Sequence, residues 1–303
     1  MANLPYRIGV DGGGTKTELI LVDGAGQILA RHVGPGCNPS HLGADGARTV
    51  LLSALEALLS QSAVRNPKSE ISATRLYVAG SAATWREIAA LLHGYGVVAT
   101  GPDSLPVLEL ATAGGPGLVL HAGTGSFVAA RAPDGSVHYA GGLGWRFGDP
   151  GSGHDLGRRA IAAALLELQG WAPATGLGEA LRAHTALADA ASITRLFYTD
   201  PEANARIAAF APRAIELAQQ GCRPAQVALA GSIGELVAQG RLVTEKLFPG
   251  ARDITCGISG AVLNNPAAKY ALQAFAESNG WPVKLHFITE PPSEGVRRLL
   301  LRD

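Results

Sequence analysis

The chain has 303 residues, 47% of them hydrophobic, so it is long enough to form two domains with substantial cores. Lysine plus arginine and aspartate plus glutamate number 25 each, and this balance gives no reason to expect a nucleic acid or an anionic membrane as partner. Cys37, Cys222 and Cys256 lie far apart without a CxxC pair, so neither zinc nor a disulfide framework is indicated. The N-terminus lacks a signal-peptide core and no apolar run has membrane-spanning length, so we expect a cytoplasmic protein.

The first third of the chain alternates short apolar segments with glycine turns, which predicts strands in an antiparallel meander followed by strand and helix pairs. Leucines and alanines at helical spacing predict the first helix. In chain order we predict strands at 6–10, 17–22 and 28–33, a helix at 43–64, a strand at 75–79, a helix at 84–93, a strand at 97–100 and a helix from Asp103 to about Ala113.

A second lobe is predicted to begin at the turn Gly114–Gly117, because the opening pattern recurs after it. Aligning Thr15 with Thr124 superimposes two apolar strands and two glycine turns. A chance likeness of two β-hairpins is the alternative to a duplication. We predict an α/β fold of two duplicated lobes with a cleft between them.

The second lobe is predicted to continue with strands at 117–120, 127–130 and 137–140, a loop at 141–153, helices at 155–170, 176–197 and 201–220, a strand at 253–258, a turn at 259–262, a helix at 266–278, a strand at 283–288 and a short helix from Glu294. The segment 224–247 fits either a helix or a strand entering a phosphate loop at Ala230–Ser232, and 253–262 competes for the phosphate-loop role.

The segment Asp11–Thr17, DGGGTKT, carries the first chemical motif. Glycines between two strands free backbone N–H groups to surround an anion, and a carboxylate at Asp11 can hold Mg²⁺ through water. The hydroxyl of Thr15 can add a phosphate contact. A glycine-rich hairpin without a ligand is the alternative. Walker and Rossmann loops are not indicated, because no Gly-Lys pair occurs and the turn leads into a strand.

Two further features point to the same chemistry. Gly123–Ser126, with the order Gly-Thr-Gly-Ser, forms a second potential phosphate turn. Asp103 follows a strand, where it could take a proton from an attacking hydroxyl during phosphoryl transfer. By spacing alone, a helix N-cap is the more common use of such an aspartate.

Two polar positions could bind a polyhydroxylated ligand. The glycine-rich loop 141–153 surrounds Asp149, and Asn38 stands before a proline. A purely structural loop and an Asn-Pro turn are the respective alternatives.

Together these motifs resemble one family. The segments IGVDGGGTKTELILVD, GCNPSHLG, VAGSAAT, GPDS, LHAGTGSF, GGLGWRFGDPGSGHDLGRRA and ISGAVLNNP look like the N-acetylglucosamine kinase branch of the sugar kinase/Hsp70/actin superfamily, also called BadF/BadG/BcrA/BcrD ATPase-like. The resemblance is collinear from residue 6 to the C-terminal helix. It implies a ribonuclease H-like, actin-like ATPase fold in both lobes.

The resemblance also implies site roles. Asp103 would be the general base for a sugar 6-hydroxyl, and Asp11 would lie near Mg²⁺. Sugar hydroxyls would meet Asn38, Asp149 and Gly142, with Gly80-Ser81 nearby. The nucleotide would contact Gly12, Gly13, Gly14, Thr15, Gly123, Thr124, Gly125, Ser126, Ser259, Gly260, Ala261 and Val262. In this register Ala230–Ser232 is helical.

Departures from the family pattern lie on the sugar side, at Leu143 and Ser104. The three cysteines do not match the iron–sulfur ligands of the family's dehydratase activators. A nucleotide-dependent switch that activates a partner protein is the alternative function, because the same fold can serve it. A sugar sensor without catalysis is less consistent with the presence of both Asp11 and Asp103.

The sequence therefore predicts an ATP- and Mg²⁺-dependent hexosamine kinase, with N-acetylglucosamine as first and glucosamine as second choice of substrate. We predict an N-terminal ATPase and sugar-binding lobe at 1–114, joined by a returning helix at about 293–303, and a nucleotide-binding lobe at 115–292. The expected partners are the amino sugar, ATP and a second copy in a homodimer.

Overall fold

The computed structural model describes residues 5–62, 64 and 67–302. The chain divides into two compact units: the first runs to Ala113 and resumes at Glu290, and the second spans Gly114–Thr289. The cleft predicted from the sequence stays a prediction. Residue 63, inside the helix predicted at 43–64, lies outside the described residues.

The first unit contains a five-stranded mixed sheet in the order β3-β2-β1-β4-β5. The first three strands form the predicted antiparallel meander, and the last two run parallel to β1. Parallel strands end at the same edge of a sheet, so residues that follow β1, β4 and β5 become neighbours. The strands are β1 Tyr6–Gly12, β2 Lys16–Val22, β3 Ile28–Pro35, β4 Ile71–Val78 and β5 Val97–Pro102.

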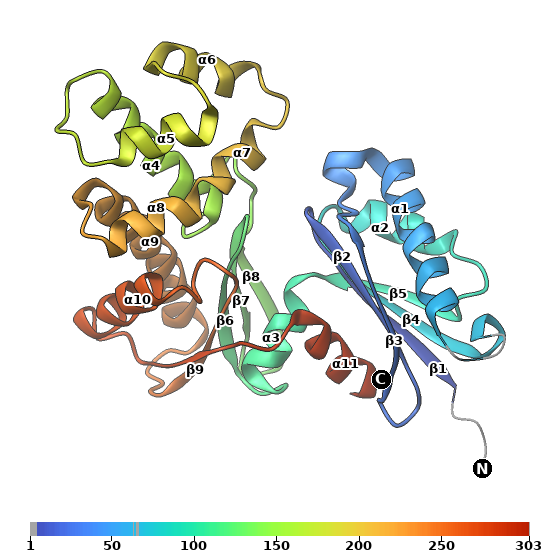
Figure 1. Ribbon diagram of the computed structural model, residues 1–303. Helices are drawn as coiled ribbons and strands as arrows, with labels where there is room; N and C mark the ends of the chain where they lie inside the picture. The colour runs from blue at the N-terminus through green and yellow to red at the C-terminus, as the bar shows by residue number, and fades with distance from the viewer. Residues whose placement is uncertain (1–4, 63, 65–66, 303) are drawn as a thin grey trace. The chain divides into compact units, whose positions relative to one another are not determined.

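Helices cover both faces of this sheet (Figure 1). Leucines of α1 pack on β1 and β2 in one core, and Val296 and Leu300 of α11 pack on Ile20 and Val22 in another. The unit's helices are α1 Pro39–Gln61, α2 Ala82–Ala90, α3 Ser104–Thr112 and α11 Pro292–Arg302, with a 3₁₀ turn at Pro67–Glu70.

The second unit repeats the topology of the first. Its sheet has the order β10-β9-β6-β7-β8, so an antiparallel meander again precedes two parallel strands. The duplication predicted from the two glycine turns is thereby confirmed. The strands are β6 Gly117–Ala122, β7 Ser126–Arg131, β8 Val137–Gly141, β9 Ile254–Ser259 and β10 Val283–Phe287.

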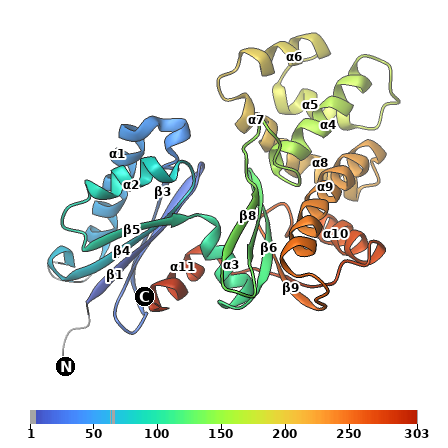
Figure 2. The same cartoon turned by 180° about the vertical axis from the view of Figure 1, so that it is seen from behind.

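The helices of the second unit pack with its sheet in one core (Figure 2). Two of the long helices predicted from the sequence are wrong, because each is two helices. Ala186 ends α5 in the left-handed conformation, and Pro212 interrupts the next segment because proline lacks the N–H that continues a helix. The helices are α4 Gly153–Leu168, α5 Leu177–Thr185, α6 Ala190–Thr199, α7 Ala203–Ala209, α8 Ala211–Gln219, α9 Arg223–Leu247 and α10 Pro266–Ser278.

The ambiguous segment is settled as helix. Ala230–Ser232 lies inside α9, and β9 forms the strand predicted at 253–258, followed by a turn. The returning helix α11 packs against α3 in the first unit. A Cβ at Gly295 would lie 2.0 Å from the carbonyl oxygen of Pro106, so this close approach requires glycine. Of the helices that the structure describes, none is both long and apolar enough to cross a membrane.

Candidate functional site

The first glycine turn joins β1 to β2, and neighbouring residues pack closely against one side of it. The N–H of Gly13 donates to the carbonyl of Lys16 at 2.9 Å, and that of Cys37 donates to the carbonyl of Gly13 at 3.1 Å. A Cβ at Gly12 would lie 2.8 Å from both the Cys37 sulfur and a Val78 methyl group. Gly14 and Thr15 are exposed. The turn is therefore anchored on one side and open on the other, as anion binding requires.

Asp11 and Asp103 lie at the same edge of the first sheet. Asp11 is registered opposite Tyr77 on β4, which is registered opposite Gly101 on β5, and Asp103 follows the end of β5. Burial, then the negative charge of Asp103, raises the pKa of Asp11 to about 7, while Lys16 acts in the opposite direction. The structure therefore brings together the predicted metal ligand and the predicted base.

Asp103 occupies the N-cap position of α3 but makes no capping hydrogen bond with its side chain. The capping alternative considered from the sequence is therefore wrong. Burial raises the pKa of its carboxyl, although the backbone N–H groups of Asp103 and Ser104 favour the ionised form. A carboxylate with a raised pKa is a stronger base than a solvated one, which suits proton abstraction near neutral pH.

Asn38 is the N-cap of α1, followed by Pro39 in the first turn. Its side-chain oxygen accepts from the N–H of Ser40 at 2.9 Å. Gly80 has φ +104°, and a Cβ there would lie 2.6 Å from that oxygen. The helix cap thus uses the Asn38 oxygen, and the backbone of Gly80 lies against it as the resemblance implies.

The second glycine turn joins β6 to β7, and its two hydroxyl groups differ. Thr124 is exposed. Ser126 is buried, and its hydroxyl donates to the carbonyl of Pro150 at 2.6 Å. Because a serine hydroxyl has one proton, Ser126 has none left to donate to a phosphate in this arrangement. Of the two hydroxyl groups, that of Thr124 is available to a ligand.

The loop between β8 and α4 has an exposed first half and a buried second half. Leu143 and Phe147 are 67% and 80% exposed, whereas Asp149–Gly153 is buried. Gly142 has φ +63°, and a Cβ there would overlap the Tyr139 ring. The exposed half is therefore open to a ligand, and the buried half is held mainly by contacts within the unit.

Asp149 lies against the second glycine turn. A Cβ at Gly125 would lie 2.9 Å from Asp149 Oδ2, and the N–H of Gly144 donates to Oδ1 at 3.1 Å. Burial raises the pKa of Asp149, the backbone N–H groups of Gly144 and Ser126 oppose this, and the charge of Asp155 adds to it. Asp149 therefore links the loop to the turn that is predicted to bind phosphate.

The predicted adenosine segment Ser259–Val262 packs on the strand that leads into this turn. The N–H of Val262 donates to the carbonyl of Ala122 at 3.1 Å. Gly260 has φ +97°, and a Cβ there would lie 2.2 Å from the same carbonyl oxygen. The two nucleotide segments predicted for the second unit are therefore neighbours.

The residues around Asp11 fit a divalent cation of the Mg²⁺ type. Asp11 offers one carboxylate, and the charge of a bound cation would offset its burial and the repulsion from Asp103. Mg²⁺ often takes one or two protein carboxylates, with water and substrate phosphates as its other ligands. No group of three or more acidic, histidine or cysteine ligands occurs in the described part of the chain.

Three residues near these segments were missed at the level of sequence. Ser232 and Asp155 join α9 to the buried half of the loop by hydrogen bonds. His154 is buried against the Trp145 ring, and its Nε2 has no hydrogen-bond partner. The sequence Gly-Ser-Gly-His-Asp at 151–155 is typical of a helix N-cap at Ser152. It contains no pattern that predicts contacts with α9.

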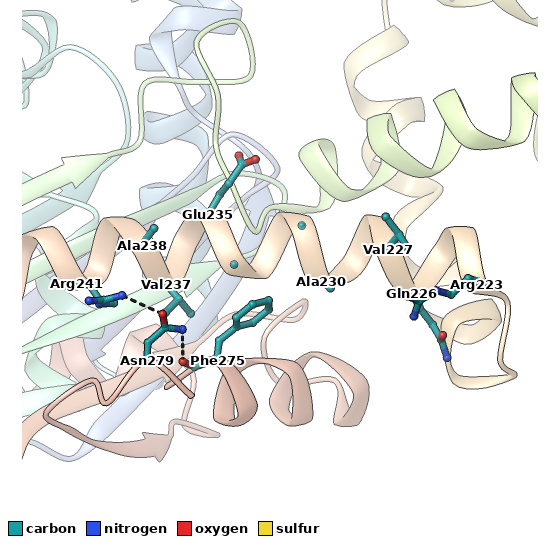
Figure 3. A pocket seen from close by; sticks show the side chains of 12 residues that line it. Arg223, Gln226, Val227, Ala230, Glu235, Val237, Ala238, Arg241, Phe275 and Asn279 are labelled. Atoms are coloured by element: carbon teal, nitrogen blue, oxygen red, sulfur yellow. Dashed lines mark hydrogen bonds between the residues drawn. The ribbon is translucent and has the colours of Figure 1, made fainter. Parts of the chain in front are cut away.

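Two surface cavities lie away from the predicted site residues. One of about 630 Å³ lies between α9 and α10, beside Arg241, Phe275 and Asn279 (Figure 3). Another of about 540 Å³ lies on α2 and β5. No residue predicted to bind sugar or nucleotide lines either one.

Curated relatives of this chain are amino-sugar kinases. An N-acetyl-D-glucosamine kinase of Dictyostelium discoideum is 27% identical over 228 residues, which cover 71% of each chain. An N-acetylmuramic acid/N-acetylglucosamine kinase of Clostridium acetobutylicum is 32% identical over 174 residues, 54% of each chain, so the match spans about half of that relative. A solved structure of a candidate N-acetylglucosamine kinase from Chromobacterium violaceum is 25% identical with a TM-score of 0.79, covering 98% of this chain and 99% of that one.

The match to a family profile extends over nearly the whole chain. It covers residues 8–297, and so includes both glycine turns, Asp103 and most of the returning helix. The duplicated sheets and the anchored glycine turns agree with that match. The chain belongs to the BadF/BadG/BcrA/BcrD ATPase family.

Proposed function

We propose that this protein is an ATP-dependent kinase that phosphorylates the 6-hydroxyl of an amino sugar, with N-acetylglucosamine as first and glucosamine as second choice. The relatives named above act as N-acetylglucosamine kinases, which supports the substrate class. The observation that carries the proposal is Asp103, a partly buried carboxylate with a raised pKa at the carboxyl end of a strand, not engaged in capping α3.

In the proposed reaction, Asp103 accepts the proton of the sugar hydroxyl as its oxygen attacks the γ-phosphorus of ATP, and ADP leaves. Asn38, beside Gly80 and Ser81, would orient the sugar with its amide group. Asp149 and Gly142 would add contacts from the second unit. Fixing the hydroxyl and its base in one geometry supplies much of the rate enhancement in phosphoryl transfer.

The backbone N–H groups of the glycine turns would bind the phosphates, except those of Gly13 and Gly123, which donate to carbonyls within their own turns. Gly12–Thr15 would contribute from the first unit and Gly123–Ser126 from the second, with Thr124 as the hydroxyl donor. Ser259–Val262 would line the adenosine pocket. Asp11 would hold Mg²⁺, which neutralises phosphate charge when bound.

A coupled assay of ADP release tests the proposal. Purified protein is incubated with ATP and, in separate reactions, N-acetylglucosamine, glucosamine, N-acetylmuramic acid and glucose. The proposal requires sugar-dependent ADP release that is greatest with an amino sugar, together with a phosphomonoester on oxygen 6 of the product. ATP consumption that no hexosamine stimulates would contradict it and favour a nucleotide-dependent switch.

The proposal includes a homodimer, as expected from the sequence. Light scattering during gel filtration measures the mass in solution, and a mass near 31.1 kDa would contradict the dimer.

A further inference from the structure

Ser232 lies in α9 with its side chain completely buried. Its hydroxyl oxygen accepts from the N–H of Gly151 at 3.1 Å, and its O–H donates to Asp155 Oδ2 at 2.7 Å. One side chain on α9 is thus bonded both to the loop before α4 and to the first turn of α4.

The chemistry fixes the direction of both hydrogen bonds. Burial raises the pKa of Asp155, but hydrogen bonds from Ser232, Arg159 and Arg158 outweigh it, so the pKa lies below its ordinary value. An ionised carboxylate only accepts, so the single proton of Ser232 goes to Asp155. The Ser232 oxygen is then free to accept from Gly151.

The bridge, meaning the two hydrogen bonds of Ser232 to Gly151 and Asp155, holds a segment that has no space to take another backbone path. Gly151 has φ +83°, and a Cβ there would lie 2.6 Å from a Leu236 methyl group, so the backbone lies directly on α9. A buried N–H that loses its acceptor is destabilised, because water cannot replace the partner. The Ser232 hydroxyl therefore stabilises one particular path of the chain.

That path sets the place of Asp149. The N–H of Ser152 donates to the carbonyl of Asp149 at 3.1 Å, and the N–H of Gly153 donates to the carbonyl of Gly123 at 2.8 Å. Residues 149–153 are therefore bonded to α9 through Gly151 and to the second glycine turn through Gly153 and Pro150.

We propose that Ser232, with Asp155, is a positioning residue that holds segment 149–153 in place, so that Asp149 stays against the turn Gly123–Ser126. The kinetic consequence rests on the proposed function, in which Asp149 contacts the sugar. The structural part of the proposal does not rest on that function: it states only that the order of segment 149–153 depends on the Ser232 hydroxyl.

The test compares Ser232→Ala with Glu235→Gln in the full-length protein. Glu235 forms an ion pair with Arg159 at 2.7 Å, and Arg159 also contacts Asp155. The Glu235 side chain is 60% exposed. It lies on the side of α9 away from α10 (Figure 3). The control therefore removes a charge from the network while leaving the hydroxyl in place.

Hydrogen exchange gives a readout that does not require activity. In Ser232→Ala, the Gly151 amide should exchange roughly threefold to tenfold faster, corresponding to the loss of one hydrogen bond. Glu235→Gln should match the wild type. Unchanged exchange at Gly151 in Ser232→Ala would overturn the proposal, and so would an equal acceleration throughout α4 and α9, which indicates general loosening.

Steady-state kinetics should show an effect on the sugar but not on ATP. Ser232→Ala should lower kcat/KM for the sugar about tenfold to hundredfold. KM for ATP should stay within about threefold, because the N–H of Gly123 still donates to the carbonyl of Gly125 inside the turn. An unchanged kcat/KM for the sugar would overturn the positioning role. If the wild type itself phosphorylates no hexosamine, the proposed function fails while the exchange pattern still tests the bridge.

Discussion

Asp11 and Asp103 lie at one edge of the first sheet, where burial and the charge of Asp103 raise the pKa of Asp11 to about 7. Two partly buried carboxylates near each other cannot both ionise without cost. The pair therefore needs a cation or a proton, and in the proposed reaction Mg²⁺ and the sugar hydroxyl supply them.

The first prediction concerns Asp103→Asn. The amide cannot accept a proton from the sugar, so kcat should fall at least ~100-fold while nucleotide affinity stays within about threefold. Loss of the neighbouring charge should also lower the pKa of Asp11, which carboxyl NMR measures. Asp45→Asn, an exposed carboxylate on α1, is the control. Near-wild-type turnover in Asp103→Asn would refute the assignment of the base.

The second prediction concerns Asp11→Asn and pH. The folded-state pKa of Asp11 lies above the unfolded value, so the unfolded state loses this proton first and folding stability falls as pH rises from about 4 to 7. Without divalent cations at pH 8, Asp11→Asn should therefore be more stable than the wild type by about 1 kcal/mol or more.

The same variant should bind metal-free ATP normally and lose the tightening that Mg²⁺ gives the wild type. Calorimetry with and without EDTA measures this difference. A variant that is less stable than the wild type at pH 8, or that keeps the full effect of Mg²⁺, would contradict the role of Asp11.

The third prediction separates the two roles of Asn38. Asn38→Ala removes the helix cap and should cost about 1 kcal/mol of stability, whereas Asn38→Asp keeps a capping oxygen and should be near neutral. Both lack the amide donor, so both should raise KM for the sugar about tenfold. A wild-type KM in Asn38→Asp would show that the amide does not contact the sugar.

The fourth prediction contrasts the hydroxyls of the second glycine turn. Thr124→Val should raise KM for ATP roughly threefold to tenfold with little change in melting temperature, because Thr124 is exposed. Ser126→Ala should lose about 1–2 kcal/mol of stability, because the carbonyl of Pro150 loses its donor. The opposite pattern in the two variants would contradict the assignment of Thr124 as the ligand contact.

The fifth prediction uses two glycines with positive φ in the second unit. Gly260→Ala should lose about 2–4 kcal/mol of stability and weaken nucleotide binding, because the new Cβ would overlap the carbonyl of Ala122. Gly250→Ala, where no atom lies within 4 Å of the new Cβ, should cost only about 1 kcal/mol. Equal losses would mean that close approach at Gly260 is not the cause.

Local patterns in the sequence determined much of this protein. Glycine turns between apolar segments predicted the meander that opens each unit, and their recurrence at Thr15 and Thr124 predicted the duplicated topology. The helix at 266–278 was also placed correctly. These features depend on φ preferences and hydrophobic periodicity, which act between near neighbours in the chain.

Only the tertiary structure decided the features that depend on distant partners. Spacing alone favoured a cap for Asp103, but the folded chain puts it near Asp11 and leaves the cap unmade. Ser232, within a segment that also resembled a phosphate loop, instead holds Gly151 from the interior of α9. Burial and long-range hydrogen bonds arise from parallel strand register and helix packing, so residues 81 or 92 positions apart acquire their roles only when the chain is folded.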